Sequence, residues 1–189
     1  DYAIANGWTT RNPLSTYRSK IEAKPILFVT HAELKSIEAL TIEDETLSRI
    51  RDMFVFSCWT GMAYKDLERL KPEHISLING QWCIIKPREK QKRNFRNTQF
   101  VPIFPVSDAI LKKYSEHCNE TGFLLPVPTN QHYNRILKGL AIAANITRIN
   151  VTTHVARRTF TTLMLNMGLD MDTLGSIVGH TTAQTTRKY

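Results

Sequence analysis

The sequence predicts a mainly α-helical domain with a small three-stranded antiparallel β-sheet, an α+β class, on three observations. Apolar residues recur at helical spacing along most of the 189 residues. Three short β-rich runs, HISLI, QWCII and QFVPI, lie together near the middle of the chain. Asn79-Gly80, between the first two runs, is a strong signal for a tight hairpin turn.

Residues that start or stop helices bound most of the predicted helices. Thr30 and Glu33 form the pattern of a capping box ahead of the first helix. Gly61 ends the second helix, Pro72 follows the third, and Gly168 ends a long helix near the C-terminus. The predicted helices cover residues 31–40, 44–59, 64–70, 106–118, 130–145, 153–168 and 169–179, with a loop at 119–129 and a final turn or two at 181–189.

Composition limits the class of protein. The length suits one domain. Lys and Arg number 25 against 17 Asp and Glu, which gives a net charge of +8 and favours a polyanionic partner, although many basic proteins bind no particular anion. No apolar run approaches the roughly 18 residues of a membrane span. The three cysteines are far apart and form no CxxC pair, which argues against zinc and disulfides and for a reducing compartment, the cytoplasm.

Four side chains in the last third of the chain form a candidate site for phosphate chemistry. His154 and Arg157 are three residues apart on a predicted helix, so they share one face. His180 follows Gly179, and Tyr189 ends the chain. An arginine matches phosphate oxygens, a histidine donates a hydrogen bond or moves a proton, and a phenol is a possible nucleophile. Each residue alone has an ordinary structural explanation, and only the set indicates a site.

The spacing of this set resembles the signature of the tyrosine recombinases, the phage integrase family. The matching elements are His154-x-x-Arg157, Val178-Gly179-His180 and Thr186-x-x-Tyr189. The segment TGMAYKDLERL is similar to the family's T-G-x-R-x-x-E-L, and the hairpin with its basic loop is similar to the family's lysine-bearing region. The resemblance implies the tyrosine recombinase catalytic-domain fold over residues 26–189. Residues 1–25 resemble the linker that follows the family's N-terminal core-binding domain, which we expect to be missing here.

The resemblance also implies a role for each matching residue. Tyr189 would attack a DNA phosphodiester, form a 3′-phosphotyrosine and release a 5′-hydroxyl. Arg157 would hold the non-bridging oxygens, and His154 and His180 would add hydrogen bonds and proton handling. A lysine would protonate the leaving 5′-oxygen, and Lys90 is favoured over its competitors Lys86 and Lys92. No metal and no cofactor are expected, because protein cations stabilise the transferring phosphoryl group.

The chain departs from the family at one position, where Ala63 stands in place of the first arginine. Losing one such donor typically costs about 2.7–4 kcal/mol at a transition state. Three explanations compete for this departure. The enzyme is impaired, the position was mutated to trap a complex, or another arginine takes the place of the missing one. Integrases of some conjugative transposons also lack this arginine, and the chain resembles them in its TG-x-A/S-Y-x-D segment. We therefore favour substitution by Arg88, which would share a strand face with Lys90.

The expected partner is double-stranded DNA, bound by a homotetramer, with a monomer possible for the isolated domain and accessory DNA-bending proteins possible on the DNA. The basic residues expected to contact DNA are Lys86, Lys92, Arg93, Arg96, Arg135, Lys138 and Arg158, although a solvated hairpin tip explains those between the strands equally well. Gln131 and Asn134 have amides suited to reading bases or to plain solvation.

These residues favour the interpretation that the chain belongs to a bacterial site-specific recombinase that integrates or excises a mobile element. Two alternatives remain open: a catalytically impaired DNA-binding module of the same fold, and strand passage like that of a type IB topoisomerase. The Ala63 departure is the only support for the first alternative, and the short spacing between His180 and Tyr189 argues against the second.

Overall fold

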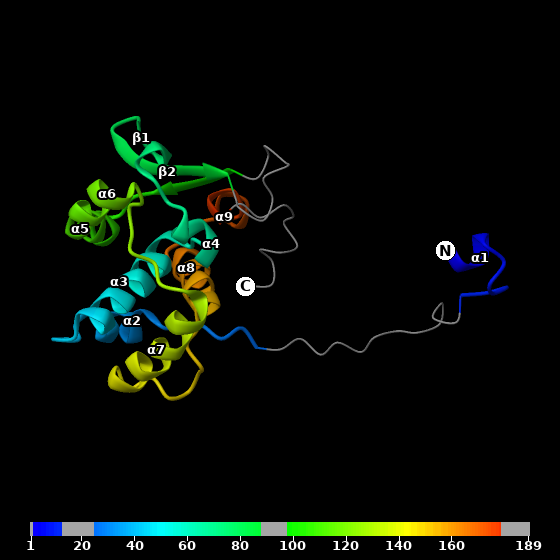
Figure 1. The fold of residues 1–189 in the computed structure, drawn as a ribbon, viewed down its shortest axis with the longest axis horizontal. Coiled ribbons are helices and arrows are strands. Elements are labelled where there is room, and N and C mark those ends of the chain that lie inside the picture. Colours follow the sequence, from blue (N-terminus) through cyan, green and yellow to red (C-terminus); the bar gives the residue numbers. More distant parts are fainter. Residues whose placement is uncertain (1, 13–24, 88–97, 179–189) are drawn as a thin grey trace.

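The computed structural model describes residues 2–12, 25–87 and 98–178, and Figure 1 shows its elements. The helices are α1 (Tyr2–Ala5), α2 (His31–Glu38), α3 (Glu45–Thr60), α4 (Tyr64–Glu68), α5 (Pro105–Lys113), α6 (Ser115–Thr121), α7 (Asn130–Ala143), α8 (Thr153–Asn166) and α9 (Met171–Val178). A 3₁₀ turn, η1 (Pro72–His74), leads into the strands β1 (Ile75–Ile78), β2 (Gln81–Pro87) and β3 (Thr98–Pro102). The mainly α fold with three strands is the predicted one.

The first helices of the domain begin where their capping residues predict. The Thr30 side chain accepts a hydrogen bond from the Glu33 backbone amide, and the Glu33 carboxylate accepts one from the Thr30 amide at 2.7 Å. Arg148, far along the chain, also donates to the Glu33 carboxylate, and this hydrogen bond holds the pKa of Glu33 below its ordinary value. Asp44 caps α3 by accepting from the amide of Leu47. The predicted capping box is confirmed.

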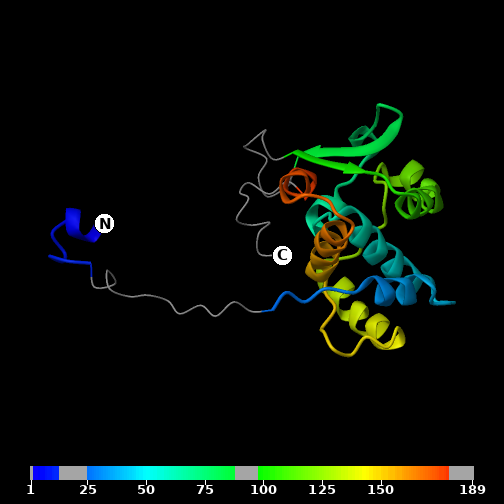
Figure 2. The ribbon, with the colours of Figure 1, turned by 180° about the vertical axis from the view of Figure 1, so that it is seen from behind.

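Helices α3 and α8 pack against each other and form the centre of the core. Phe54, Phe56 and Phe160 are among their fully buried side chains. Helices α2, α5 and α7 pack around α3, and α9 packs against β3 and α8. Figures 1 and 2 show the sheet lying over this helical layer, with α5 and α6 near one end of the strands and α9 near the other. Burial of these apolar faces is the main source of stability.

The three strands form one antiparallel sheet in the order β1-β2-β3, as predicted. Asn79 and Gly80 have positive φ angles of 49° and 81°, which is the backbone of a two-residue turn whose twist matches the strands. On β2, Ile84 pairs with Ile75 and Val101, and Ile84 is fully buried. Lys86 lies two residues further along β2 and therefore on the same, inward face.

The structure corrects the prediction for the helix that follows the sheet. The single helix predicted over 106–118 is two helices, α5 and α6, with a break at Tyr114. The Tyr114 hydroxyl and the Lys113 ammonium both reach the buried carboxylate of Asp52 on α3, so tertiary contacts override the local periodicity. Helix α7 begins at Asn130, as predicted, with Thr129 at its cap position. Helix α1 lies within residues 1–25, the segment that resembles the family's linker.

The described part of the chain also bears on membrane-spanning helices and on the cysteines. No helix within it is long and apolar enough to cross a membrane. All three cysteines fall within it, and all are free thiols. Burial raises the pKa of the Cys58 thiol well above its ordinary value, which suits an inert core residue.

Candidate functional site

The turn between α3 and α4 carries the T-G-x-A segment. Gly61 ends α3 in the left-handed conformation, with φ 65°, and its amide donates to the carbonyl of Ser57. The carbonyl of this glycine accepts a hydrogen bond from another element, the Arg157 side chain on α8. Ala63, at the position of the family's first arginine, is the residue before α4 and makes no side-chain cap.

Arg157 joins this turn to the end of α9. Its side chain lies on the inner face of α8, and the residue is only 7% exposed. Nη1 donates to the carbonyl of Gly61 at 2.7 Å and Nη2 donates to the carbonyl of Val178 at 2.6 Å. Gly61 is two residues before Ala63, and Val178 is two residues before His180. One buried guanidinium therefore joins three of the chain segments that the motif draws from: α8, the Gly61 turn and the end of α9.

His154 lies one helical turn before Arg157, in the first turn of α8, and this residue is exposed. It lines a cavity of about 380 Å³ that Ala63 and the buried Asp66 also line. Ala63, which the resemblance places where the family has its first arginine, and His154, the first histidine of the motif, therefore line one cavity. Tyr64 borders the same cavity, and its hydroxyl lies 2.9 Å from both a Glu68 carboxylate oxygen and the Pro128 carbonyl. Burial and the Glu68 hydrogen bond raise the pKa of Tyr64 to about 12.

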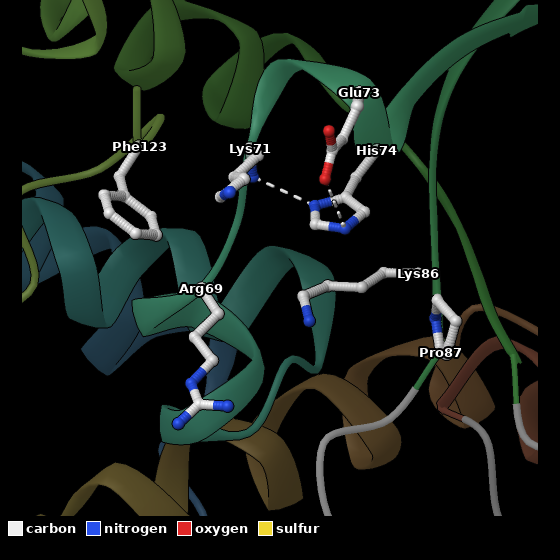
Figure 3. Close-up of a pocket in the computed structure, with 7 residues that line it drawn as sticks. All are labelled: Arg69, Lys71, Glu73, His74, Lys86, Pro87 and Phe123. Carbon is white, nitrogen blue, oxygen red and sulfur yellow. Dashed lines mark hydrogen bonds and ion pairs between the residues drawn. The ribbon is translucent and has the colours of Figure 1, made fainter. Parts of the chain in front are cut away.

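Lys86 lines a second cavity, of about 520 Å³, that is shown in Figure 3. The residue is 2% exposed, although lysine is almost never fully buried. Arg69 and Lys71, from the end of α4 and the segment after it, contribute two more cations to the walls. Glu73 is the one carboxylate among the described residues that line this cavity, and its Oε1 lies 4.0 Å from Nε2 of His74.

Gln99 connects the sheet to the Arg157 junction. It pairs with Lys86 across β2 and β3 and has no exposed surface. Its Nε2 donates to the carbonyl of Val178 at 3.4 Å, the same carbonyl that Arg157 holds. Its Oε1 is buried and has no hydrogen-bond partner among the described residues. Strand β3 and helix α8 therefore both fix the end of α9.

The predicted site residues fall into three groups. Arg157, His154 and Lys86 belong to the connected region just described. Arg135 and Lys138 are exposed on α7 and Arg158 is half-buried on α8, and none of the three lines either cavity described above. The predicted residues Tyr189, His180, Lys90, Arg88, Lys92, Arg93 and Arg96 lie outside the described residues.

The structure adds residues that sequence reasoning missed. Arg69 and Lys71 were not singled out, because nothing in a single sequence shows that they face Lys86. Asn134 was considered as a reader of bases, but its Oδ1 accepts from the amide of Thr153 at 3.0 Å and so caps the start of α8. Its Nδ2 donates to Asn130. This amide therefore positions the helix that carries His154 and Arg157.

Comparison with solved structures gives the fold. The Tn1549 transposon integrase in complex with transposon right end DNA superposes with a TM-score of 0.77 at 16% identity, covering 100% of this chain and 70% of that one. XerA recombinase superposes with a TM-score of 0.68 at 22% identity, covering 95% of this chain and 64% of that one. The whole described arrangement is therefore a fold that DNA recombinases of known structure have.

Comparison of sequences gives the family. Tyrosine recombinase XerC of Staphylococcus aureus (strain JH9) is 26% identical over 170 residues, which is 82% of this chain and 54% of XerC. The chain thus spans about half the length of the curated relatives it matches. The model of the phage integrase family matches residues 28–189, nearly the whole domain. With the motif elements gathered around Arg157, this match shows that the chain belongs to the phage integrase family.

Proposed function

We propose that this chain is the DNA-cleaving part of a site-specific recombinase that cuts and rejoins DNA through Tyr189. The observation that carries the proposal is the buried Arg157, which bridges the turn before Ala63 and the segment before His180. The two carbonyls take one N–H from each Nη, and a guanidinium has five N–H donors, so a donor of this fixed group would be offered to phosphate oxygens. His154, one turn away, borders the same region.

The proposed chemistry conserves the energy of the phosphodiester. The Tyr189 oxygen attacks phosphorus, the bond from phosphorus to the 5′-oxygen breaks, and a 3′-phosphotyrosine forms. His154 or His180 takes the phenol proton, and a lysine gives a proton to the leaving 5′-oxygen. Arg157 stabilises the negative charge that builds on the non-bridging oxygens. Attack by a 5′-hydroxyl on the phosphotyrosine reverses these steps and rejoins a strand.

Covalent capture tests the proposal. A DNA substrate whose released fragment, the one that carries the new 5′-hydroxyl, diffuses away should leave a covalent protein–DNA adduct on a denaturing gel. Tyr189→Phe should abolish that adduct because its ring has no oxygen to attack phosphorus. Tyr2→Phe, which changes an exposed phenol on α1, is the matched control and should keep the adduct. The assay should be run on the full-length protein as well as on this chain, since this chain covers only 54% of XerC. An adduct that survives Tyr189→Phe contradicts the proposal.

The proton donor can be assigned with modified DNA. The sequence favours Lys90, but the burial of Lys86 next to the Arg157 junction supports Lys86 in this role. Lys86→Met should slow cleavage by about 100- to 10,000-fold, the range for general acid–base catalysis. DNA with sulfur in place of the leaving 5′-oxygen needs no proton, so the variant should cleave it at nearly the wild-type rate. If Lys90→Met shows this rescue and Lys86→Met does not, the role belongs to Lys90.

Arg88 is our proposal for the arginine that replaces the one missing at Ala63. A second candidate function rests on the same departure, since a site without this donor could bind DNA and cleave it poorly. The capture assay separates the two functions. Specific DNA binding without any adduct, in the full-length protein as well, would favour an impaired DNA-binding module.

The wider biological role is also a proposal. The substrate would be double-stranded DNA and the working assembly a homotetramer, with integration or excision of a mobile element in the bacterial cytoplasm as the outcome. The fold shared with an integrase bound to a transposon end supports the mobile element, and the similarity to XerC supports a bacterial recombinase. The basic side chains Arg135, Lys138 and Arg158 would add contacts to the DNA backbone.

A further inference from the structure

We propose that the cavity between α4, η1 and β2 binds a backbone phosphate of the DNA that flanks the scissile phosphate, with Arg69 as its principal ligand. The inference rests on the proposed function, because it takes the bound polymer to be DNA. It concerns a contact beyond the motif residues, made by an arginine that the motif does not include.

The charge of the cavity favours an anion. Arg69, Lys71 and Lys86 line one space of about 520 Å³, and Glu73 is the one carboxylate among the described residues of its lining. That carboxylate belongs to a side chain that is 70% exposed, and it lies toward His74 at the upper rim in Figure 3. A phosphate that enters this space would bring several acceptor oxygens to a concave surface lined by three basic side chains.

The orientation of the side chains selects Arg69 as the main ligand. In Figure 3 the Arg69 guanidinium and the Lys86 ammonium point to the same side of the cavity. Lys71 instead turns toward Phe123, and its Nζ lies 5.4 Å from the centre of that ring. Arg69 is the residue just after α4, so its backbone is fixed by the helix, and its side chain lines the cavity. A planar fork in this place suits two phosphate oxygens.

The position of the cavity argues for a flanking phosphate. Ala63 and His154 line the other cavity, whereas Lys86 lines this one. Ala63 and Arg69 stand at opposite ends of α4, six residues apart, which is about 9 Å along a helix. Arg69 is therefore displaced from the position of the missing arginine. Lys86, adjacent to both the Arg157 junction and Arg69, would lie between the two phosphates.

A salt series on the full-length protein in a Tyr189→Phe background gives the first test, because binding is then measured without cleavage. Arg69→Ala should weaken binding to the target DNA about tenfold at moderate salt. It should also reduce the slope of log Kd against log salt by about 0.9, the value for one lost phosphate contact. Arg49→Ala is the control, since Arg49 is a half-buried arginine on α3 that pairs with Glu45 and lines neither of these two cavities. Equal slopes for Arg69→Ala and the parent would overturn the inference.

Neutral methylphosphonate groups placed one at a time in the DNA locate the contact. The parent protein should lose affinity at one position next to the cleavage site, and Arg69→Ala should lose nothing more at that position. We call a position coupled when neutralising its phosphate weakens binding by the parent but not by Arg69→Ala. Absence of a coupled position, or coupling at the scissile phosphate itself, would refute the flanking assignment. If inorganic phosphate alone raises the melting temperature of the parent but not of Arg69→Ala, while no DNA position couples, the cavity binds a free anion and the inference is wrong. Wild-type adduct formation reports on the proposed function separately from these binding results.

Discussion

Replacing Arg157 by lysine is expected to slow formation of the covalent protein–DNA adduct by about 100- to 1000-fold, the usual effect of losing one oxyanion-type donor. Lysine keeps the positive charge, so the total charge that attracts DNA is unchanged. It lacks the planar fork, and one ammonium cannot reproduce two Nη donors that point at Gly61 and Val178. The expected result is therefore a defect in chemistry far larger than the defect in binding.

The same substitution should also weaken the fold, because the Gly61 carbonyl loses its Arg157 donor and the Val178 carbonyl keeps only the 3.4 Å hydrogen bond from Gln99. A buried acceptor left without a partner costs about 1–3 kcal/mol. Urea unfolding of Arg157→Lys measures this loss, and the adduct assay must be run where the variant is still folded. Arg49→Ala removes a half-buried arginine on α3 that pairs only with the exposed Glu45 among the described residues, and it should match the wild type in both assays. Wild-type adduct rates in a folded Arg157→Lys protein would show that this guanidinium is not a phosphate ligand.

Much of the fold could be predicted because its signals are local. The capping box of Thr30 and Glu33 requires only residues three apart, and the Asn79-Gly80 turn requires only two neighbours. The single helix predicted through Tyr114 failed for the opposite reason. Its periodicity is sound, but the side chains at its middle reach Asp52, more than 60 residues away. Hydrogen bonds of that separation leave no pattern in a single sequence.

The residues of the candidate site likewise divide into those that the sequence identifies and those that only the structure identifies. Arg157 and His154 could be found because the motif fixes their spacing on one helix. The roles of Gln99 and Asn134 could not, because each acts on an element that is distant in sequence: Gln99 on the end of α9, and Asn134 on the start of α8. Arg69 has no local signal either, since its importance depends on the strand that carries Lys86. Supporting residues are the part of a site that a motif does not encode.

Gly61→Ala should be among the most damaging single-methyl substitutions in the chain. Gly61 has φ 65°, a conformation that costs a residue with a Cβ about 1–2 kcal/mol. A Cβ built at this position would lie 2.4 Å from Cδ1 of Phe160, whose ring is fully buried. Overpacking of a core of this kind adds about 1–3 kcal/mol. The expected loss of unfolding free energy is thus about 2–5 kcal/mol, together with displacement of the carbonyl that Arg157 holds.

Gly122→Ala separates the two contributions. Gly122 also ends a helix in the left-handed conformation, with φ 75°, but a Cβ there meets no atom within 4 Å. It should therefore show only the backbone cost of about 1–2 kcal/mol. Adding Phe160→Leu to Gly61→Ala makes room beside the new methyl group, so the double variant should be more stable than the sum of the two single losses. Urea unfolding of the parent, of the three single variants Gly61→Ala, Gly122→Ala and Phe160→Leu, and of the double variant measures each difference in unfolding free energy. Equal losses for Gly61→Ala and Gly122→Ala would show that Phe160 yields to the methyl group, and that the turn tolerates a side chain where the motif has glycine.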